Sequence, residues 1–186
     1  MNLVIVGMRG AGKSNVSRRL ALISKRPALS TDDLVRYETG QSIPDFVQQE
    51  GWSAFRDVEY QVLQKLLAME SAIVDCGGGI MVELDDSGSE IFSERKAELL
   101  SQLGRVVFLA GDLDRLAAKA NRGARPILSD QVSVREIMER RLPWYERIAD
   151  VTIDIEGRKR QSIAEKIASE QLGGWSDPAA EKVPSN

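Results

Sequence analysis

A glycine-rich stretch near the start of the chain constrains its fold more than any other feature. Residues 7–14 read GMRGAGKS, which fits the pattern G-x-x-x-x-G-K-[ST]. The glycines let the backbone curl until successive N–H groups point inward, and a helix that follows adds the positive end of its dipole. An apolar run at residues 3–6 precedes the stretch, and apolar residues at helical spacing follow it. The sequence therefore predicts a strand, a phosphate-binding loop and a helix in direct succession.

Short apolar runs recur along the chain and predict its fold class. They occupy residues 3–6, 72–74, 106–109 and 151–155, with a weaker run at 27–29. Short aliphatic runs without alternation are typical of strands buried on both faces of a parallel sheet. The stretches between them carry apolar residues three to four apart, which is the helical period. This alternation predicts an α/β fold with right-handed crossovers.

The length and the composition predict one domain with a short tail. A chain of 186 residues is close to the size of one ordinary domain. We expect this domain to span residues 1–172. Residues 173–186 are small, polar and rich in Pro and Gly, so we expect a disordered tail there. The acidic stretch at residues 83–90 is interpreted as a surface loop or an insertion.

The residues that the chain lacks exclude several chemistries. It contains no histidine and one cysteine, Cys76, which excludes a His general base, a His-ligated metal, an internal disulfide and a Cys-cluster zinc site. A net charge of −3 gives no bulk attraction to nucleic acid or to a membrane surface. No apolar run is long enough for a signal peptide or a membrane span. We therefore expect a cytoplasmic protein that binds neither nucleic acid nor a membrane. Its Lys, Arg, Asp, Glu and Ser side chains are those that phosphoryl transfer uses.

The glycine-rich stretch predicts a site for a nucleoside triphosphate and Mg²⁺. Lys13 is placed to reach the β- and γ-phosphates, and the Ser14 hydroxyl to bind the metal. The alternative is a glycine-rich turn with an incidental lysine. The predicted nucleotide-binding residues are Gly10, Ala11, Gly12, Lys13, Ser14 and Asn15.

Further segments, in the same order, resemble the shikimate kinase family of aromatic amino-acid biosynthesis over about residues 2–170. The resemblance implies a P-loop kinase whose five-stranded parallel sheet has the order 2-3-1-4-5, with helices on both faces. It also implies a mobile lid over about residues 119–132, and a monomer that uses ATP to phosphorylate the 3-hydroxyl of shikimate. The segments are STDD at 30–33, GQSI at 40–43, EGWSAFRDVE at 50–59, IVDCGGG at 73–79, RPIL at 125–128 and RRLPWY at 140–145.

The resemblance assigns the acceptor hydroxyl to Asp32. This residue matches the second aspartate of the family's D-x-D motif, which holds the shikimate hydroxyls. Asp33 is one residue out of register and is the second choice. Taken alone, Asp32 or Ser30 ahead of an apolar segment is equally typical of a helix N-cap.

The resemblance assigns the shikimate carboxylate to two arginines. Arg56 and Arg141 match the family's carboxylate-binding arginines, and a guanidinium suits bidentate carboxylate binding. Gly78 and Gly79 match a turn that lies against shikimate. Taken alone, Arg56 with Glu59 is also typical of a surface ion pair, the glycines of a tight turn, and Arg141 of a solvated cation.

The lid motif adds a third catalytic residue. Arg125 matches the family's lid arginine, which covers the phosphates and neutralises charge on the transferring group. With Lys13 and Asp32 it completes the predicted catalytic set, and the resemblance also makes Arg125 a nucleotide-binding residue. Taken alone, Arg125 is also typical of a solvated loop cation.

One departure from the family pattern bears on the metal. Ser30 occupies the position of the first aspartate of D-x-D, which the family associates with Mg²⁺. Asp75 follows a buried strand, where many P-loop enzymes place a magnesium-associated aspartate. Our hypothesis is that Asp75 supplies the carboxylate that Ser30 lacks, so the predicted metal ligands are Ser14 and Asp75. The alternative is that Asp75 only binds loop amides.

Two other functions stay open at this point. One is a kinase of another small molecule, such as gluconate or a nucleoside monophosphate, although two arginines aimed at one carboxylate disfavour a nucleoside. The other is a catalytically weak binding module that resembles shikimate kinase, for which Ser30 is the best support.

Overall fold

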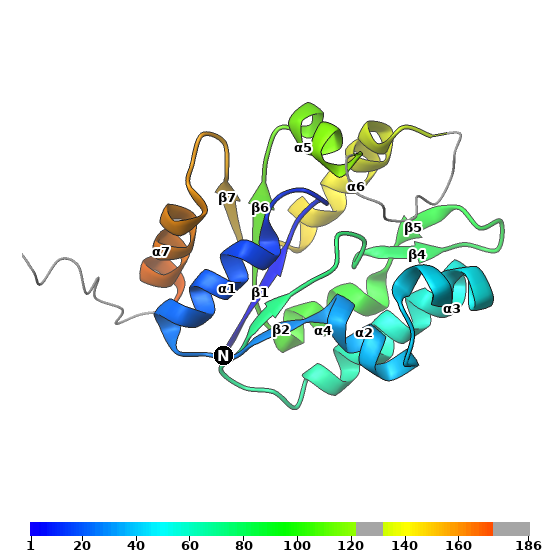
Figure 1. Cartoon of the computed structure of the whole chain (residues 1–186), viewed down its shortest axis with the longest axis horizontal. Helices are drawn as coiled ribbons and strands as arrows, with labels where there is room; N and C mark the ends of the chain where they lie inside the picture. Colours follow the sequence, from blue (N-terminus) through cyan, green and yellow to red (C-terminus); the bar gives the residue numbers. More distant parts are fainter. Residues whose placement is uncertain (122–131, 173–186) are drawn as a thin grey trace, which may run out of the picture.

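A five-stranded parallel sheet forms the centre of the molecule (Figure 1). The computed structural model describes residues 1–121 and 132–172. The strands of the sheet lie in the order β2-β3-β1-β6-β7, and every neighbouring pair is parallel. Counted along the chain within this sheet alone, the order is 2-3-1-4-5, so the expected sheet is confirmed. The strands are β1 (Asn2–Val6), β2 (Ala28–Ser30), β3 (Ile73–Asp75), β6 (Gly104–Ala110) and β7 (Val151–Asp154).

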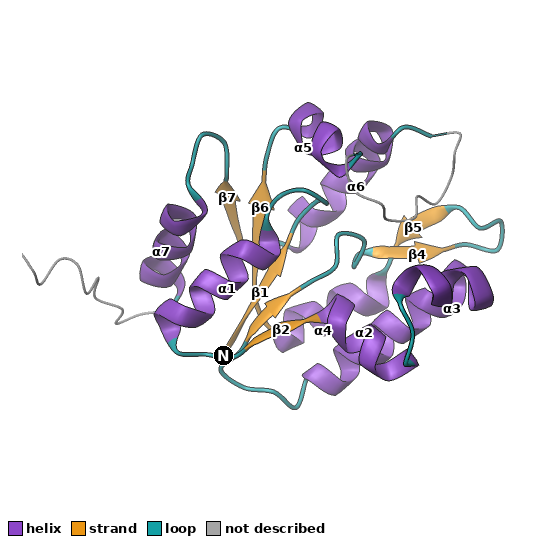
Figure 2. Cartoon of the chain, viewed as in Figure 1, coloured by secondary structure: helices purple, strands orange, loops and turns teal. Residues whose placement is uncertain are grey.

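Helices cover both faces of this sheet, as Figure 2 shows. On one face α1 and α7 pack against each other, and on the other α4 packs on β1 and β6. Helix α3 packs against α2 and α4. The helices are α1 (Lys13–Ser24), α2 (Thr31–Thr39), α3 (Ile43–Leu66), α4 (Glu94–Leu103), α5 (Leu113–Ala120), α6 (Val134–Ile148) and α7 (Arg160–Gln171).

A two-stranded antiparallel hairpin stands apart from the main sheet. It consists of β4 (Val82–Leu84) and β5 (Glu90–Phe92), and it lies beside α3 (Figure 1). The sequence predicts a surface loop at residues 83–90. That prediction is right only for the turn, because Glu83 and Glu90 at its two ends belong to strands and have partly buried side chains.

The sequence explains why the central strands are buried. All five residues of β1 are buried, and so are residues 106–109 of β6. Each buried Val, Leu or Ile contributes about 1.5–3 kcal/mol relative to exposure. The sequence also marks where three helices begin, because Ser30, Ser42 and Ser133 are the N-caps of α2, α3 and α6. Each serine side chain accepts a backbone N–H group that the first turn leaves unpaired.

The parallel arrangement decides where the polar residues gather. The carboxyl ends of parallel strands meet at one edge of the sheet, which is where α/β proteins bind ligands. Here the glycine-rich loop follows β1, Asp32 follows β2, and the glycine triplet follows β3. No helix in the described ranges is both long and apolar enough to cross a membrane.

Candidate active site

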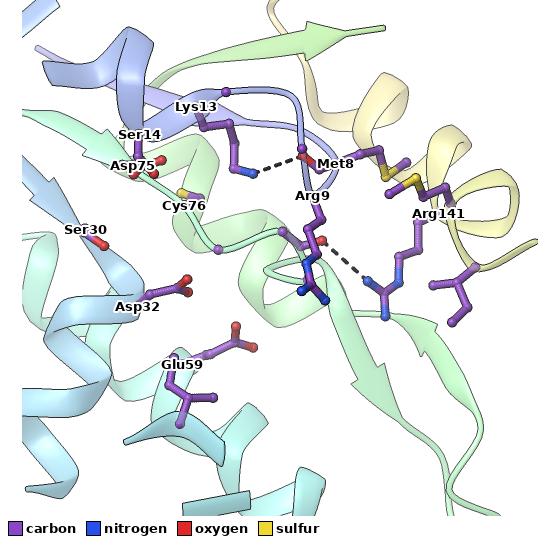
Figure 3. Close-up of a pocket in the computed structure, with 18 of the residues that line it drawn as sticks. Met8, Arg9, Lys13, Ser14, Ser30, Asp32, Glu59, Asp75, Cys76 and Arg141 are labelled. Carbon is purple, nitrogen blue, oxygen red and sulfur yellow. Dashed lines mark hydrogen bonds between the residues drawn. The ribbon is translucent and has the colours of Figure 1, made fainter. Parts of the chain in front are cut away.

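A pocket of about 680 Å³ opens at this edge of the sheet. Figure 3 shows side chains from the loop after β1, from α2, α3 and α6, and from the segment after β3 around it. Sequence segments separated by more than 100 residues thus share one cavity. Of the predicted residues that the structure describes, those lining it are Gly10, Gly12, Lys13, Ser14, Asn15, Asp32, Arg56, Asp75, Gly78, Gly79 and Arg141.

The glycine-rich loop has the curled backbone that a phosphate cradle requires. Gly10 and Gly12 adopt φ angles of 87° and 88°, which glycine reaches without steric cost. Lys13 Nζ donates to the carbonyl oxygens of Gly7 at 2.9 Å and Met8 at 3.2 Å, so its ammonium lies across the loop. Helix α1 begins at Lys13 without a side-chain cap, so no side chain caps the positive end of its dipole, which suits an anion.

Ser14 and Asp75 lie together at the base of the pocket (Figure 3). Ser14 forms a side-chain hydrogen bond with Asp75, whose Oδ1 is buried and accepts no hydrogen bond from the described residues. Burial raises the pKa of Asp75, and the Ser14 hydrogen bond and the Lys13 charge offset only part of that rise. A hydroxyl beside an unsatisfied carboxylate oxygen fits the oxygen ligands that Mg²⁺ prefers.

Ser30 has a structural role that explains why a serine stands at this position, and this role involves no metal. Its side chain accepts the backbone N–H of Asp33 at 3.2 Å and thereby caps α2. Asp32 therefore is not the N-cap, and it lines the pocket. Asp33 instead forms an ion pair with Arg36 on the surface of α2. Of the two aspartates considered from the sequence, Asp32 is the one placed at the pocket.

The arginine of α3 is buried and held by an acid. Gly51, at φ 84°, interrupts α3, and Arg56 lies in its second half. Arg56 Nη1 donates to Glu59 Oε2 at 2.8 Å and to the Gly79 carbonyl at 3.2 Å. Arg56 and Glu59 are only 3% and 2% exposed, so the alternative of a surface ion pair is wrong. The guanidinium also lies over the Trp52 ring, 5.3 Å from its centroid.

A buried lysine completes this cluster, and sequence reasoning missed it. Lys96 Nζ of α4 donates to Glu59 Oε2 at 3.1 Å and to the Val82 carbonyl at 2.5 Å. Burial lowers the pKa of Lys96, an effect that the Glu59 charge opposes and the Arg56 charge reinforces. The sequence signal was weak, because the spacing of apolar residues in α4 does not say that Lys96 faces the interior.

The second predicted arginine lies on α6, on the other side of the glycine triplet. Arg141 Nη1 donates to the Gly78 carbonyl at 3.4 Å, and the Tyr145 hydroxyl donates to the same oxygen at 3.0 Å. A Cβ built on Gly79 would lie 3.2 Å from both terminal nitrogens of Arg56 and 3.6 Å from Arg141 Nη1. The two guanidinium groups therefore flank one glycine, an arrangement suited to an anionic group.

The triplet itself needs glycine at more than one position. A Cβ on Gly78 would lie 3.1 Å from the backbone nitrogen of Arg9, because the loop after β1 packs directly on this turn. A side chain here would push the phosphate-binding loop away from the two arginines. The alternative of a plain tight turn does not explain this close approach.

The remaining predicted residue and most of the predicted lid are not placed. Arg125 lies outside the described residues, as do residues 122–131 and 173–186. The first residue of the predicted lid, Lys119, is described and lines the pocket, and its Nζ donates to the Gly10 carbonyl at 3.1 Å.

Comparisons with known proteins agree on one family. A family model described as shikimate kinase matches residues 9–171. The shikimate kinase of Leptospira biflexa is 46% identical over 169 residues, covering 90% of this chain and 93% of the relative. That of Leptospira borgpetersenii is 42% identical over 170 residues, covering 89% and 95%.

Solved structures point the same way. A shikimate kinase from Acinetobacter baumannii in complex with shikimate superposes with a TM-score of 0.75 at 31% identity, covering 89% of each chain. The shikimate kinase of Aquifex aeolicus gives a TM-score of 0.75 at 22% identity, covering 90% of this chain and 94% of the other, and that likeness supports the fold alone.

Proposed function

Because the chain belongs to the shikimate kinase family, we propose that its pocket transfers the γ-phosphoryl group of ATP to the 3-hydroxyl of shikimate, giving 3-phosphoshikimate and ADP. The observation that carries this assignment is the convergence of Arg56 and Arg141 on Gly79, in the same pocket as the glycine-rich loop. One cavity thus has a place for a carboxylate and a place for phosphates.

The glycine-rich loop holds the nucleotide. Backbone N–H groups of residues 10–15 bind phosphate oxygens, and Lys13 leaves its carbonyl contacts to reach the β- and γ-phosphates. Ser14 and Asp75 would hold Mg²⁺, which would supply positive charge against the phosphates. The unsatisfied Oδ1 of Asp75 supports this site, and it gives Asp75 the metal role that Ser30 does not fill.

Asp32 orients the acceptor. Its carboxylate lies at the pocket wall, against Gly77. The transition state of phosphoryl transfer is loose, so the position of the attacking hydroxyl matters more than its early deprotonation. Asp32 accepts a hydrogen bond from the 3-hydroxyl, aims that oxygen at the γ-phosphorus, and takes its proton as the new bond forms.

Arg56 and Arg141 fix the other end of shikimate. Each guanidinium donates to the substrate carboxylate, and this contact sets the distance from the carboxylate to the hydroxyl that reacts. Gly78 and Gly79 let the substrate approach the backbone between them. Such orientation removes much of the entropic cost of bringing two reactants together.

Arg125 is assigned by the family resemblance, as the cation that neutralises the transferring group from the lid. The domain limits of 1–172, the lid over about 119–132 and the tail over 173–186 stay predictions. The monomeric state, the cytoplasmic location and the absence of nucleic-acid and membrane partners also stay predictions.

The experiment that tests this function measures ADP release from Mg-ATP by the purified protein with shikimate, with gluconate and without an acceptor. We expect release that depends on shikimate and is lost in Lys13→Met. If gluconate stimulates ADP release and shikimate does not, the substrate is gluconate and the proposed substrate is wrong. Shikimate binding with turnover no faster than that of Lys13→Met would make the protein a binding module.

A further inference from the structure

The β4–β5 hairpin carries a buried carboxylate to the substrate pocket. Val82 N donates to the Gly79 carbonyl at 2.9 Å, so β4 continues directly from the glycine triplet. The chain turns at residues 85–89 and returns as β5, which begins at Glu90. The Glu90 side chain is only 4% exposed. An acidic side chain buried at the end of an exposed turn needs a partner.

That partner is Arg141. Arg141 Nε donates to Glu90 Oε2 at 3.0 Å, and Arg141 Nη2 pairs with Glu90 Oε1. The two bonds make a bidentate contact along one edge of the guanidinium. They use only two of its five N–H donors.

The other edge of the Arg141 guanidinium faces the pocket. Among the described residues, Nη1 contacts only the Gly78 carbonyl, at the long distance of 3.4 Å, and Figure 3 shows it directed toward the glycine turn. Arg141 lines the pocket and Glu90 does not. The carboxylate therefore holds the guanidinium from behind and leaves donors on the side where the substrate binds.

The surrounding charges keep this region attractive to an anion. Glu90 also lies 3.6 Å from Arg140 Nη2, and Glu59 pairs with both Arg56 and Lys96. Four cations therefore lie with two carboxylates here: Arg56, Lys96, Arg140 and Arg141 with Glu59 and Glu90. An incoming carboxylate meets a net positive charge, so Glu90 need not be displaced before the substrate binds.

We propose that Glu90 is a positioning residue, which holds Arg141 in the orientation that binds the substrate carboxylate. This inference rests on the proposed function, because it takes Arg141 as one of the two arginines that bind the substrate carboxylate. Without Glu90, the long arginine side chain samples several rotamers, and only a fraction of them present the fork to the pocket. The hairpin is thereby a part of the substrate site.

The test compares Glu90→Ala and Glu90→Gln with wild type, and uses Glu83→Gln as the matched control. Glu83 lies in the same hairpin but pairs with Arg95. Misplacing a substrate-binding group by about 1 Å can cost on the order of 100-fold. We expect Glu90→Ala to raise the KM for shikimate by about 10-fold or more, with an unchanged KM for ATP. The KM of Glu90→Gln for shikimate should lie between those of wild type and Glu90→Ala. The KM of Glu83→Gln should equal that of wild type.

A second measurement separates positioning from a merely structural role. Shikimate and its methyl ester are compared as substrates, since the ester lacks the carboxylate charge. In wild type the preference for the acid is strong, and in Glu90→Ala it falls. An equal loss of kcat/KM for both substrates would overturn the proposal. So would a lower KM for shikimate in Glu90→Ala, since Glu90 would then compete with the substrate.

Calorimetric binding of shikimate distinguishes this proposal from the proposed function. If wild type binds shikimate but does not turn it over, the kinase activity is wrong and the affinity ratio of Glu90→Ala to wild type still decides the role of Glu90. If wild type does not bind shikimate, both proposals fail.

Discussion

The carboxylate of Asp32 lies so close to the backbone of Gly77 that a Cβ at Gly77 would overlap Oδ1 of Asp32. The same glycine donates its backbone N–H to the Thr31 hydroxyl at 2.9 Å. The start of α2 and the turn after β3 are therefore locked together. This contact holds the carboxylate that we propose to orient the acceptor against the turn that packs, through Gly78, on the glycine-rich loop.

A methyl group at Gly77 should disable the enzyme through this contact. In Gly77→Ala the Asp32 carboxylate must move, and a displacement of about 1 Å can lower turnover on the order of 100-fold. The measurement is kcat for shikimate together with a thermal unfolding curve. Full activity in Gly77→Ala would show that the position of Asp32 is not critical.

Gly88→Ala is the control for this change. Gly88 lies in the hairpin turn with open space around its Cβ position and a φ of 81°. We expect it to lose about 1 kcal/mol of stability from backbone strain and to keep its turnover.

Replacing Arg56 by lysine should weaken shikimate binding although the charge is kept. Arg56 contacts Glu59, the Gly79 carbonyl and two aromatic rings at once, and an ammonium cannot reproduce this planar fork. Loss of one charge-assisted bond, of about 1.5–3 kcal/mol, raises KM about 10-fold or more. Steady-state kinetics with varied shikimate measure the change.

Arg95→Lys is the matched control for Arg56→Lys. Arg95 also stacks on an aromatic ring, that of Tyr60 at 4.6 Å, and pairs with two carboxylates, but its side chain is 40% exposed. We expect a KM for shikimate equal to that of wild type. Equal effects of the two substitutions would remove Arg56 from the substrate site.

The sequence predicts the parts of this site that depend on local order. The stretch GMRGAGKS needs only its neighbouring strand and helix to form a phosphate loop, and β1 is apolar throughout. The positions after parallel strands then follow from topology, which brings Asp32 and Asp75 to one edge. The expected α/β class and the strand order are confirmed for these reasons.

The sequence pairs Arg56 with Glu59, but it does not predict that Glu90 is the partner of Arg141 or that Lys96 is a second partner of Glu59. Glu90 lies 51 residues before Arg141, and Lys96 lies 37 residues after Glu59. Neither separation fits a period of a helix or a strand. The acidic stretch at residues 83–90 is also misinterpreted from the sequence. A run of charged residues is typical of a surface loop, but here the hairpin buries the side chain of Glu90.

The stability of the protein should depend on pH through Lys96. Its folded-state pKa is lowered from 10.5 because burial outweighs the attraction of Glu59 and Glu83, with Arg56 acting in the same direction as burial. As pH rises from this lowered value towards 10.5, the unfolded chain binds more protons than the folded one, so this group makes stability rise with pH. The free energy of unfolding of wild type should therefore increase relative to Lys96→Met over that window.

Urea unfolding of both proteins at a series of pH values up to 10.5 measures this trend. Lys65→Met is the control for the loss of a lysine charge, because Lys65 is exposed and pairs with Glu38 on the surface, a contact worth about 1 kcal/mol or less. A difference between wild type and Lys96→Met that is constant or falls with pH would contradict the lowered pKa of Lys96.

The magnesium dependence of turnover should reveal the role of Asp75. In Asp75→Asn the side chain keeps its size but loses the charge beside Ser14, and groups that support a metal site commonly change its affinity about 10- to 100-fold. We expect the Mg²⁺ concentration for half-maximal turnover to rise on that order, with an unchanged KM for shikimate. Asp57→Asn is the control, since Asp57 is exposed and pairs with Arg95. If Asp75→Asn titrates with Mg²⁺ as wild type does, Asp75 does not replace the missing aspartate at Ser30, and the unsatisfied Oδ1 serves another group in the pocket.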